Sequence, residues 1–169
     1  MGHGEDKLPI AYHPDVCRML ASMQSRIQAM RALAYEAAAQ MDIAARSSGA
    51  ERATVAQARV DLMIPVVKVW CTEQSVDIAS MGIQVHGGMG YVEETGAAQH
   101  LRDARITTIY EGTTAIQAND FMGRKILRDG GAEITKLLAE VLQTAKHLSQ
   151  SEPSAAKAPK PQNPVHLVV

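Results

Sequence analysis

Glu111 is the residue of this sequence whose type and neighbours best suit acid–base chemistry. It follows a β-branched run at 106–109, which we expect to be extended and buried, and it precedes Thr113, a residue type that favours helix N-caps. A carboxylate there would lie near the positive end of a helix dipole, at the wall of an apolar pocket. Because an apolar wall disfavours the charged form of a carboxyl group, the setting suits a general base. A helix-start glutamate without a chemical role fits the same pattern, and the motif alone leaves both readings open.

Glycines accompany this candidate base. Gly87, Gly88 and Gly90 lie close together ahead of it, and Gly112 follows it directly. Because glycine has no β-carbon, the backbone at these positions can turn sharply or let a ligand come close. A helix C-cap and turn also explains Gly87 and Gly88, and the two interpretations are compatible. The sequence contains neither GxGxxG nor GxxxxGK[ST], so it does not predict a Rossmann fold or a phosphate-binding loop.

Other polar residues of this region are weaker candidates for a catalytic or metal-binding role. Glu93 and Glu94 are rival candidates for a catalytic acid, but their neighbours indicate a solvated position. His86 and His100 have no further ligand between them at metal-binding spacing. We therefore predict no metal site.

Three motifs in a fixed order resemble the C-terminal helical domain of the acyl-CoA dehydrogenases. They are 84–91 (QVHGGMGY), 101–106 (LRDARI) and 109–113 (IYEGT), and the resemblance extends over about 7–131. The segments 13–16 (HPDV) and 118–125 (ANDFMGRK) are similar to the branch that includes the 3-methylmercaptopropionyl-CoA dehydrogenases.

The resemblance implies a role for each matched residue. Glu111 would be the base that removes the α-proton of an acyl-CoA thioester while the β-hydrogen leaves as hydride to FAD, and Tyr110 and Gly112 would bind the substrate. The loop near residue 87 would receive the adenine-side half of FAD from a neighbouring subunit. The positions that match cofactor-binding residues are Gln84, Gly87, Gly88 and Thr113.

The resemblance also implies partners and missing parts. Members of the family have an N-terminal helical domain and a middle β-domain, and no segment here resembles either, nor the flavin-binding Arg-x-Thr-Phe-Gly stretch. Ala115 replaces a residue that is often polar in the family. We therefore expect a fragment that is inactive in isolation, because a base without a hydride acceptor cannot complete the reaction. An electron-transfer flavoprotein is the implied acceptor, and a homo-oligomer (dimer or tetramer) the implied assembly.

Two alternative interpretations place the chain in a function class other than an enzyme domain. The chain could be a non-catalytic helical module for oligomerisation or interaction that derives from this family. It could also be a structural bundle with a coincidental motif, which three motifs in register argue against.

Length and composition bound the remaining possibilities. A chain of 169 residues allows one domain with its own core, and a net charge of −1 does not favour nucleic acid or an anionic membrane as partner. We find no apolar run long enough for a membrane span or a signal peptide. Cys17 and Cys71 have neither ligand-like spacing nor a secretory context. We expect a cytoplasmic protein with reduced thiols.

The elements that must position these residues are helices. Apolar residues at helical spacing predict helices over 14–46, 51–85, 95–104, 114–128 and 133–148, and therefore an all-α, up-and-down helical bundle. Pro65 predicts a kink, or two abutting helices. We divide the chain into a lead-in (1–12), the bundle domain (13–148) and a disordered tail rich in Pro, Ala and Lys (149–169).

Overall fold

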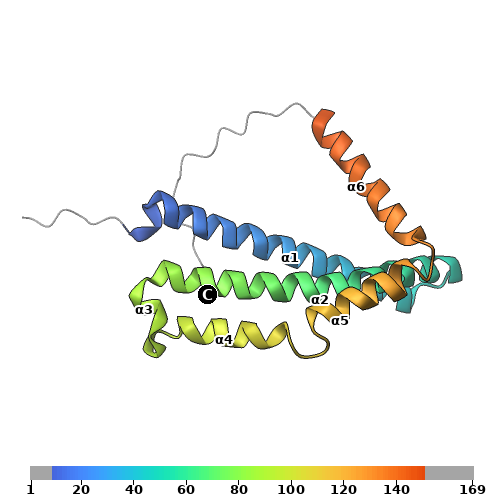
Figure 1. The fold of residues 1–169 in the computed structure, drawn as a ribbon. Coiled ribbons are helices and arrows are strands. Elements are labelled where there is room, and N and C mark those ends of the chain that lie inside the picture. The colour runs from blue at the N-terminus through green and yellow to red at the C-terminus, as the bar shows by residue number, and fades with distance from the viewer. Residues whose placement is uncertain (1–8, 151–169) are drawn as a thin grey trace, which may run out of the picture.

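The computed structural model describes residues 9–150 as an arrangement of helices in which no β-strand occurs. The elements are η1 (Ile10–Tyr12), α1 (Pro14–Arg46), α2 (Ala50–His86), α3 (Gly88–Tyr91), η2 (Glu93–Thr95), α4 (Ala97–Thr107), α5 (Thr114–Asp120), η3 (Phe121–Ile126) and α6 (Ala132–Gln150). Helices α1 and α2 form an antiparallel pair, and α4 runs back along α2 (Figure 1). The predicted all-α, up-and-down bundle is confirmed. Within 9–150, no helix has the length and apolar character to cross a membrane.

The long helices begin and end near the predicted positions. Pro14 occupies the first turn of α1, where its missing N–H costs nothing. Helix α2 is a single helix that contains Pro65, so the alternative of two abutting helices is wrong. Pro65 and Leu62 are the largest fully buried side chains of the described residues. Their burial offsets the backbone hydrogen bond that a proline cannot donate.

The predicted extended stretch at 106–109 is wrong. Helix α4 continues to Thr107, Thr108 follows with helical backbone angles, and the amide of Tyr110 still donates to the Ile106 carbonyl at 3.1 Å. A lone strand would leave its backbone groups without partners, whereas a helix pairs them within the segment. Local pairing therefore outweighs the β propensity of the branched residues.

The predicted helix over 114–128 has two parts. Helix α5 is regular, but η3 is π-helical, and the amide of Leu127 donates to the Met122 carbonyl at 3.0 Å. Gly130 and Gly131, both with positive φ, then separate this segment from α6. Helix α6 leaves the bundle at an angle (Figure 1) and extends to Gln150. The rest of the predicted tail, and residues 1–8 of the lead-in, lie outside the described residues.

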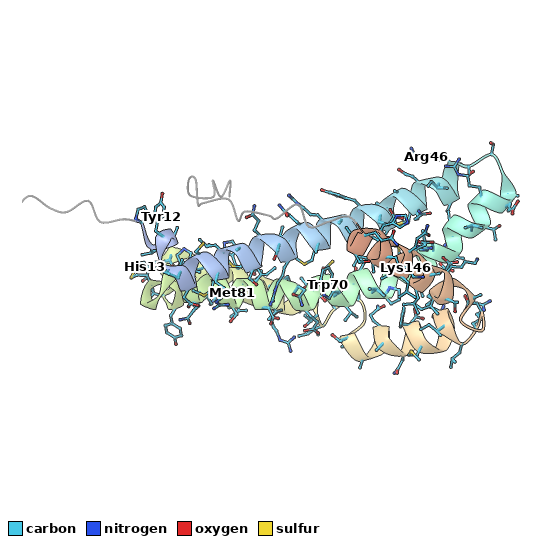
Figure 2. All side chains as sticks on the ribbon, turned by 90° about the horizontal axis from the view of Figure 1, so that it is seen from above. Tyr12, His13, Arg46, Trp70, Met81 and Lys146 are labelled. Atoms are coloured by element: carbon cyan, nitrogen blue, oxygen red, sulfur yellow. The ribbon has the colours of Figure 1, made fainter. Side chains whose placement is uncertain are left out.

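The core of the described part is narrow. Its buried apolar residues are Met19, Ala37, Ala56, Val60, Leu62, Met63, Pro65 and Ala97. Trp70, near the middle of the molecule (Figure 2), is only half-buried. Large apolar side chains are exposed on α5, η3 and α6, among them Ile116, Met122, Leu138, Val141 and Leu142, and Leu127 is exposed directly after η3. Such exposed apolar surface is typical of a domain that packs against further protein.

Candidate functional site

The loop 108–113 between α4 and α5 presents Glu111. This residue has φ +57°, and it is the only non-glycine residue between 9 and 150 with positive φ. For a residue with a β-carbon this left-handed conformation costs on the order of 1–2 kcal/mol. Backbone strain of this kind gathers at functional sites, where the surrounding structure enforces it.

Two neighbours fix this backbone conformation. Gly112 has φ +96°, a backbone conformation that residues with a β-carbon rarely adopt, so glycine is favoured there. A β-carbon would also lie 2.8 Å from Nε2 of Gln117, and the flexible end of that side chain would have to shift. The same Nε2 donates a hydrogen bond of 3.2 Å to the carbonyl oxygen of Glu111. Thr113 is the N-cap residue of α5, as predicted, but its side chain makes no capping hydrogen bond.

Glu111 lies at the surface rather than at the wall of an apolar pocket. Its side chain is exposed, and Ile106, Ile109 and Tyr110 are 53%, 48% and 51% exposed. The predicted buried approach is therefore wrong within this chain. The reason is geometric, because a helix end followed by a turn cannot direct alternate side chains to one buried face as a strand in a sheet does.

Two charged residues of α2 contact the ends of this loop. The ammonium group of Lys68 donates a hydrogen bond of 2.6 Å to the Thr107 carbonyl and lies 5.8 Å from the ring centroid of Tyr110. At the other end, the hydroxyl of Thr114 donates to the carboxylate of Glu73. Neither Lys68 nor Glu73 is predicted from the sequence alone. One signal was available, because Lys68 is the only charged residue in the apolar stretch 62–71 (LMIPVVKVWC).

The glycine corner after α2 forms a second cluster. Gly87 is the C-cap of α2 with φ +62°, as one of the two interpretations predicts. A β-carbon on Gly90 would lie 2.4 Å from the Ile83 carbonyl oxygen, so Gly90 permits a close backbone approach. Gly88 meets neither requirement, since nothing lies within 4 Å of a β-carbon built there. Gln84 is exposed one turn earlier on α2.

These two clusters lie apart. They flank the two ends of α4, whose 11 residues span about 16 Å. The structure therefore brings Tyr110, Glu111, Gly112 and Thr113 together on one loop, and Gln84, Gly87 and Gly88 together at the other end of α4. No single site of this chain joins the two sets.

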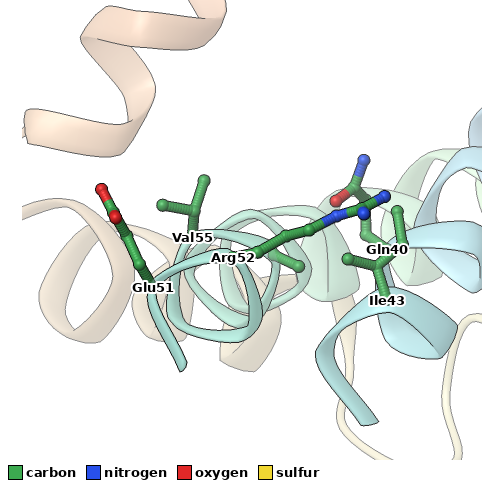
Figure 3. Close-up of a pocket in the computed structure, with 6 residues that line it drawn as sticks. Gln40, Ile43, Glu51, Arg52 and Val55 are labelled. Carbon is green, nitrogen blue, oxygen red and sulfur yellow. The ribbon is translucent and has the colours of Figure 1, made fainter. Parts of the chain in front are cut away.

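Cavities in the described part of the chain include the following two. An apolar cavity of about 350 Å³ lies beside the Glu111 loop, between α2 and the α5–η3 segment, and its lining includes Trp70, Glu73, Gln117 and Phe121. The other, of about 340 Å³, lies at the turn between α1 and α2 (Figure 3). In Figure 3 its residue Arg52 extends toward Gln40 and Ile43, while Glu51 points away from them. This second cavity contains none of the residues that the sequence analysis selects.

No metal cluster occurs in the described part of the chain, and the Cys71 thiol is not activated. No group of three or more His, Cys, Asp or Glu residues there could hold a metal ion. Burial raises the pKa of the Cys71 thiol, which disfavours the reactive thiolate.

Comparison with known proteins gives the following similarities. Residues 4–127 match the family model described as "Acyl-CoA dehydrogenase, C-terminal domain". The chain is 47% identical to 3-methylmercaptopropionyl-CoA dehydrogenase of Ruegeria pomeroyi, over 92% of this chain and 26% of that protein. It is 38% identical to the broad-specificity linear acyl-CoA dehydrogenase FadE5 of Mycobacterium tuberculosis, over 80% of this chain and 22% of that protein. The chain thus spans about a quarter of the length of these relatives.

A solved structure supports the fold. The structure described as "Bd2924 apo-form" superposes with a TM-score of 0.69 at 23% identity, over 89% of this chain and 31% of that one.

Proposed function

The chain belongs to the acyl-CoA dehydrogenase family, whose C-terminal domain it carries, and on that premise we propose that Glu111 removes the α-proton of an acyl-CoA thioester. One observation carries the proposal: the backbone of Glu111 is strained into the left-handed region in a way that presents its carboxylate at the surface. Strain that no packing requirement of the residue itself explains is consistent with a functional role.

The chemistry assigns a task to each residue of the loop. An α-proton is a weak acid, so its base must lie close to it and be correctly aimed. The Glu111 carboxylate takes that proton, Gly112 allows the turn that presents the loop to the substrate, and Tyr110 lines the acyl group. When bound, FAD supplies the oxidant, because its flavin ring accepts the hydride that leaves the β-carbon. The apolar surroundings that a base needs would come from the rest of the polypeptide, since Glu111 is exposed here.

The residues assigned to FAD fit such a ligand. Gly88 faces open space, so a dinucleotide could lie against its backbone, and Gly87 adopts the φ of +62° that turns the chain there. The Thr113 hydroxyl makes no capping bond that would compete with a ligand. Gln84 is exposed beside the same corner.

The separation of the two clusters supports a homo-oligomer. We propose that the loop of Glu111 and Thr113 serves one active site, while Gln84, Gly87 and Gly88 receive the adenine-side half of the FAD of a neighbouring subunit. A dimer or tetramer follows from this arrangement. The exposed apolar side chains of α5, η3 and α6 are consistent with it.

The substrate, the metabolic context and the electron acceptor are proposed at the level of their class. We propose an acyl-CoA as substrate, fatty acid metabolism as context and an electron-transfer flavoprotein as the acceptor of electrons. A cytoplasmic location is consistent with the two free cysteines, Cys17 and Cys71, which suit a reducing compartment.

A second function has two observations in its favour. Exposed Glu111 and the narrow core are also what a non-catalytic oligomerisation module of this family would show. The two functions differ in whether FAD is bound. A module of this kind would leave FAD unbound in every assembly that contains the chain.

The Glu111→Gln substitution tests the catalytic proposal in the complete flavoenzyme that contains this domain. Glutamine keeps the size of the side chain but cannot take a proton, so exchange of the substrate α-proton with deuterated solvent should cease, while the flavin absorption spectrum stays unchanged. Glu94→Gln, at an exposed acid of η2, is the control and should exchange at the parent rate. Normal exchange in Glu111→Gln would remove Glu111 from the role.

A further inference from the structure

We propose that Lys68 and Glu73 are positioning residues that aim the Glu111 carboxylate by holding both ends of the loop 108–113. The inference rests on the proposed function of Glu111. It adds two residues of α2, which lie 39 and 41 positions from their partners in the sequence.

Lys68 holds the first end of the loop through two contacts. Its ammonium group donates a hydrogen bond of 2.6 Å to the carbonyl of Thr107, the last residue of α4. That carbonyl belongs to the helix end, where backbone acceptors lack partners and the dipole favours a cation. The same nitrogen lies 5.8 Å from the ring centroid of Tyr110, within the range of a cation–π interaction. One half-buried ammonium group thus holds the end of α4 and the residue directly before Glu111.

Glu73 holds the second end. Its carboxylate accepts a hydrogen bond from the hydroxyl of Thr114, the first residue of α5. Both side chains are half-buried, which protects the bond from competing water. Lys68 and Glu73 are separated by about 7.5 Å along the axis of α2, at 1.5 Å per residue. A single rigid helix therefore sets the distance between the two ends of the loop.

Between these ends the backbone has little freedom. The Gln117 amide donates to the Glu111 carbonyl at 3.2 Å, and it occupies the space where a β-carbon on Gly112 would lie. With both ends and the centre of the loop held, the direction of the Cα–Cβ bond from which the Glu111 side chain starts follows from the position of α2. Proton abstraction is sensitive to such a direction, since a displacement of 1 Å costs on the order of 100-fold in rate.

A purely structural role for the same contacts predicts a different result. If Lys68 and Glu73 only hold α2, α4 and α5 together, their loss should lower stability and leave the catalytic step of the folded enzyme unchanged. If they aim Glu111, the catalytic step should slow while substrate affinity and flavin content stay the same. The division of an effect between kcat and KM therefore separates the two roles.

The first experiment replaces Lys68 in the complete flavoenzyme. Lys68→Met keeps the length of the side chain without the donor or the charge, and we expect α-proton exchange and kcat to fall on the order of 10- to 100-fold with KM unchanged. Lys68→Arg should recover most of the rate, because a guanidinium group can both donate to a carbonyl and lie over an aromatic ring. Lys146→Met, at an exposed lysine of α6, is the matched control and should leave the rate unchanged.

A second experiment needs no catalysis. In the 169-residue chain, amide hydrogen exchange of 108–113 should become faster in Lys68→Met, and also in Thr114→Val, which removes the donor to Glu73 from the other end. Unchanged protection of the loop in both variants would overturn the inference.

The outcomes separate this inference from the proposed function. Equal rates in the parent and Lys68→Met enzymes, or no recovery in Lys68→Arg, would overturn the positioning role and leave Glu111 as the base. Absence of α-proton exchange in the parent enzyme would remove the proposed function, and the aiming role with it.

Discussion

Of three glycines that look alike in the sequence, the fold requires two, for different reasons, and does not require the third. Gly87 needs its positive φ of +62°, and Gly90 needs the absence of a β-carbon 2.4 Å from a carbonyl oxygen. Gly88 has neither need, because a side chain there would meet no atom of this chain within 4 Å. A glycine that the fold does not require is the one most open to a requirement from a ligand.

The first prediction concerns this residue. In the complete flavoenzyme, Gly88→Val should lower the ratio of flavin to protein after dialysis, since its side chain would occupy the space through which a dinucleotide approaches. Its free energy of unfolding should change by less than about 0.5 kcal/mol. Gly90→Ala should give the opposite result, a loss of about 1–3 kcal/mol in urea unfolding, because the corner must open to admit the methyl group. Full flavin retention in Gly88→Val would contradict the assignment of this loop.

At the scale of elements, α6 contacts the bundle mainly through charged side chains near its first turns. Arg59 of α2 donates from Nε to Glu133 at 2.7 Å and from its two terminal nitrogens to Glu140 at 3.0 and 2.7 Å. The Glu133 side chain is only 5% exposed, and its carboxylate pairs with this partner and with Lys136 at 3.5 Å. Asp129 accepts hydrogen bonds from the amides of Gly131 and Glu133 and thereby caps the helix.

The second prediction follows from these charges. Removing Arg59 leaves a buried carboxylate with a weaker partner, so Arg59→Met should cost about 3 kcal/mol in urea unfolding followed by circular dichroism. Arg102→Met is the control, because its ion pair with Glu93 is exposed and 3.6 Å long, and it should cost less than about 0.5 kcal/mol. Equal effects of the two substitutions would contradict a role of Arg59 in holding α6 against α2.

The same element predicts a pH dependence. The hydrogen bond from Arg59 lowers the pKa of Glu140, and backbone hydrogen bonds, that of the Glu133 amide above all, lower the pKa of Asp129. A carboxyl group whose pKa is lower in the folded state stabilises the fold above its unfolded pKa of about 4, and this contribution is lost as pH falls through the folded value. Stability should therefore fall below about pH 4, and less steeply in Arg59→Met, where Glu140 has lost its partner. An unchanged pH profile in that variant would contradict this.

At the scale of the whole molecule, the described residues bury few large apolar side chains and expose many. Burial of apolar surface is the main favourable term in folding, so such a chain gains stability from whatever covers its exposed faces. The proposed homo-oligomer would therefore raise the stability of the chain as well as complete the FAD site.

The last prediction concerns this coupling. The 169-residue chain should sediment as a dimer or larger species, and its urea midpoint should rise with protein concentration over a roughly hundredfold range, as mass action requires. A monomer whose midpoint does not depend on concentration would contradict the proposed assembly. It would also leave the exposed apolar faces for a different polypeptide segment.

The sequence by itself determined the helices, because helix formation rests on contacts within a few residues. The boundaries of α1 and α2, the turn at Gly87 and the N-cap position of Thr113 all follow from local spacing and residue type. The same local reasoning failed at 106–109, where β-branched residues indicate a strand but residues 9–150 contain no strand to pair with.

Only the tertiary structure decided how the candidate base is presented. The left-handed backbone of Glu111, the preference for glycine at 112 and the open space at Gly88 are not visible in residue types. The contacts of Lys68 and Glu73 with the loop join residues 39 and 41 positions apart. A sequence read locally cannot pair such residues, because their proximity arises only when α2 packs against α4 and α5.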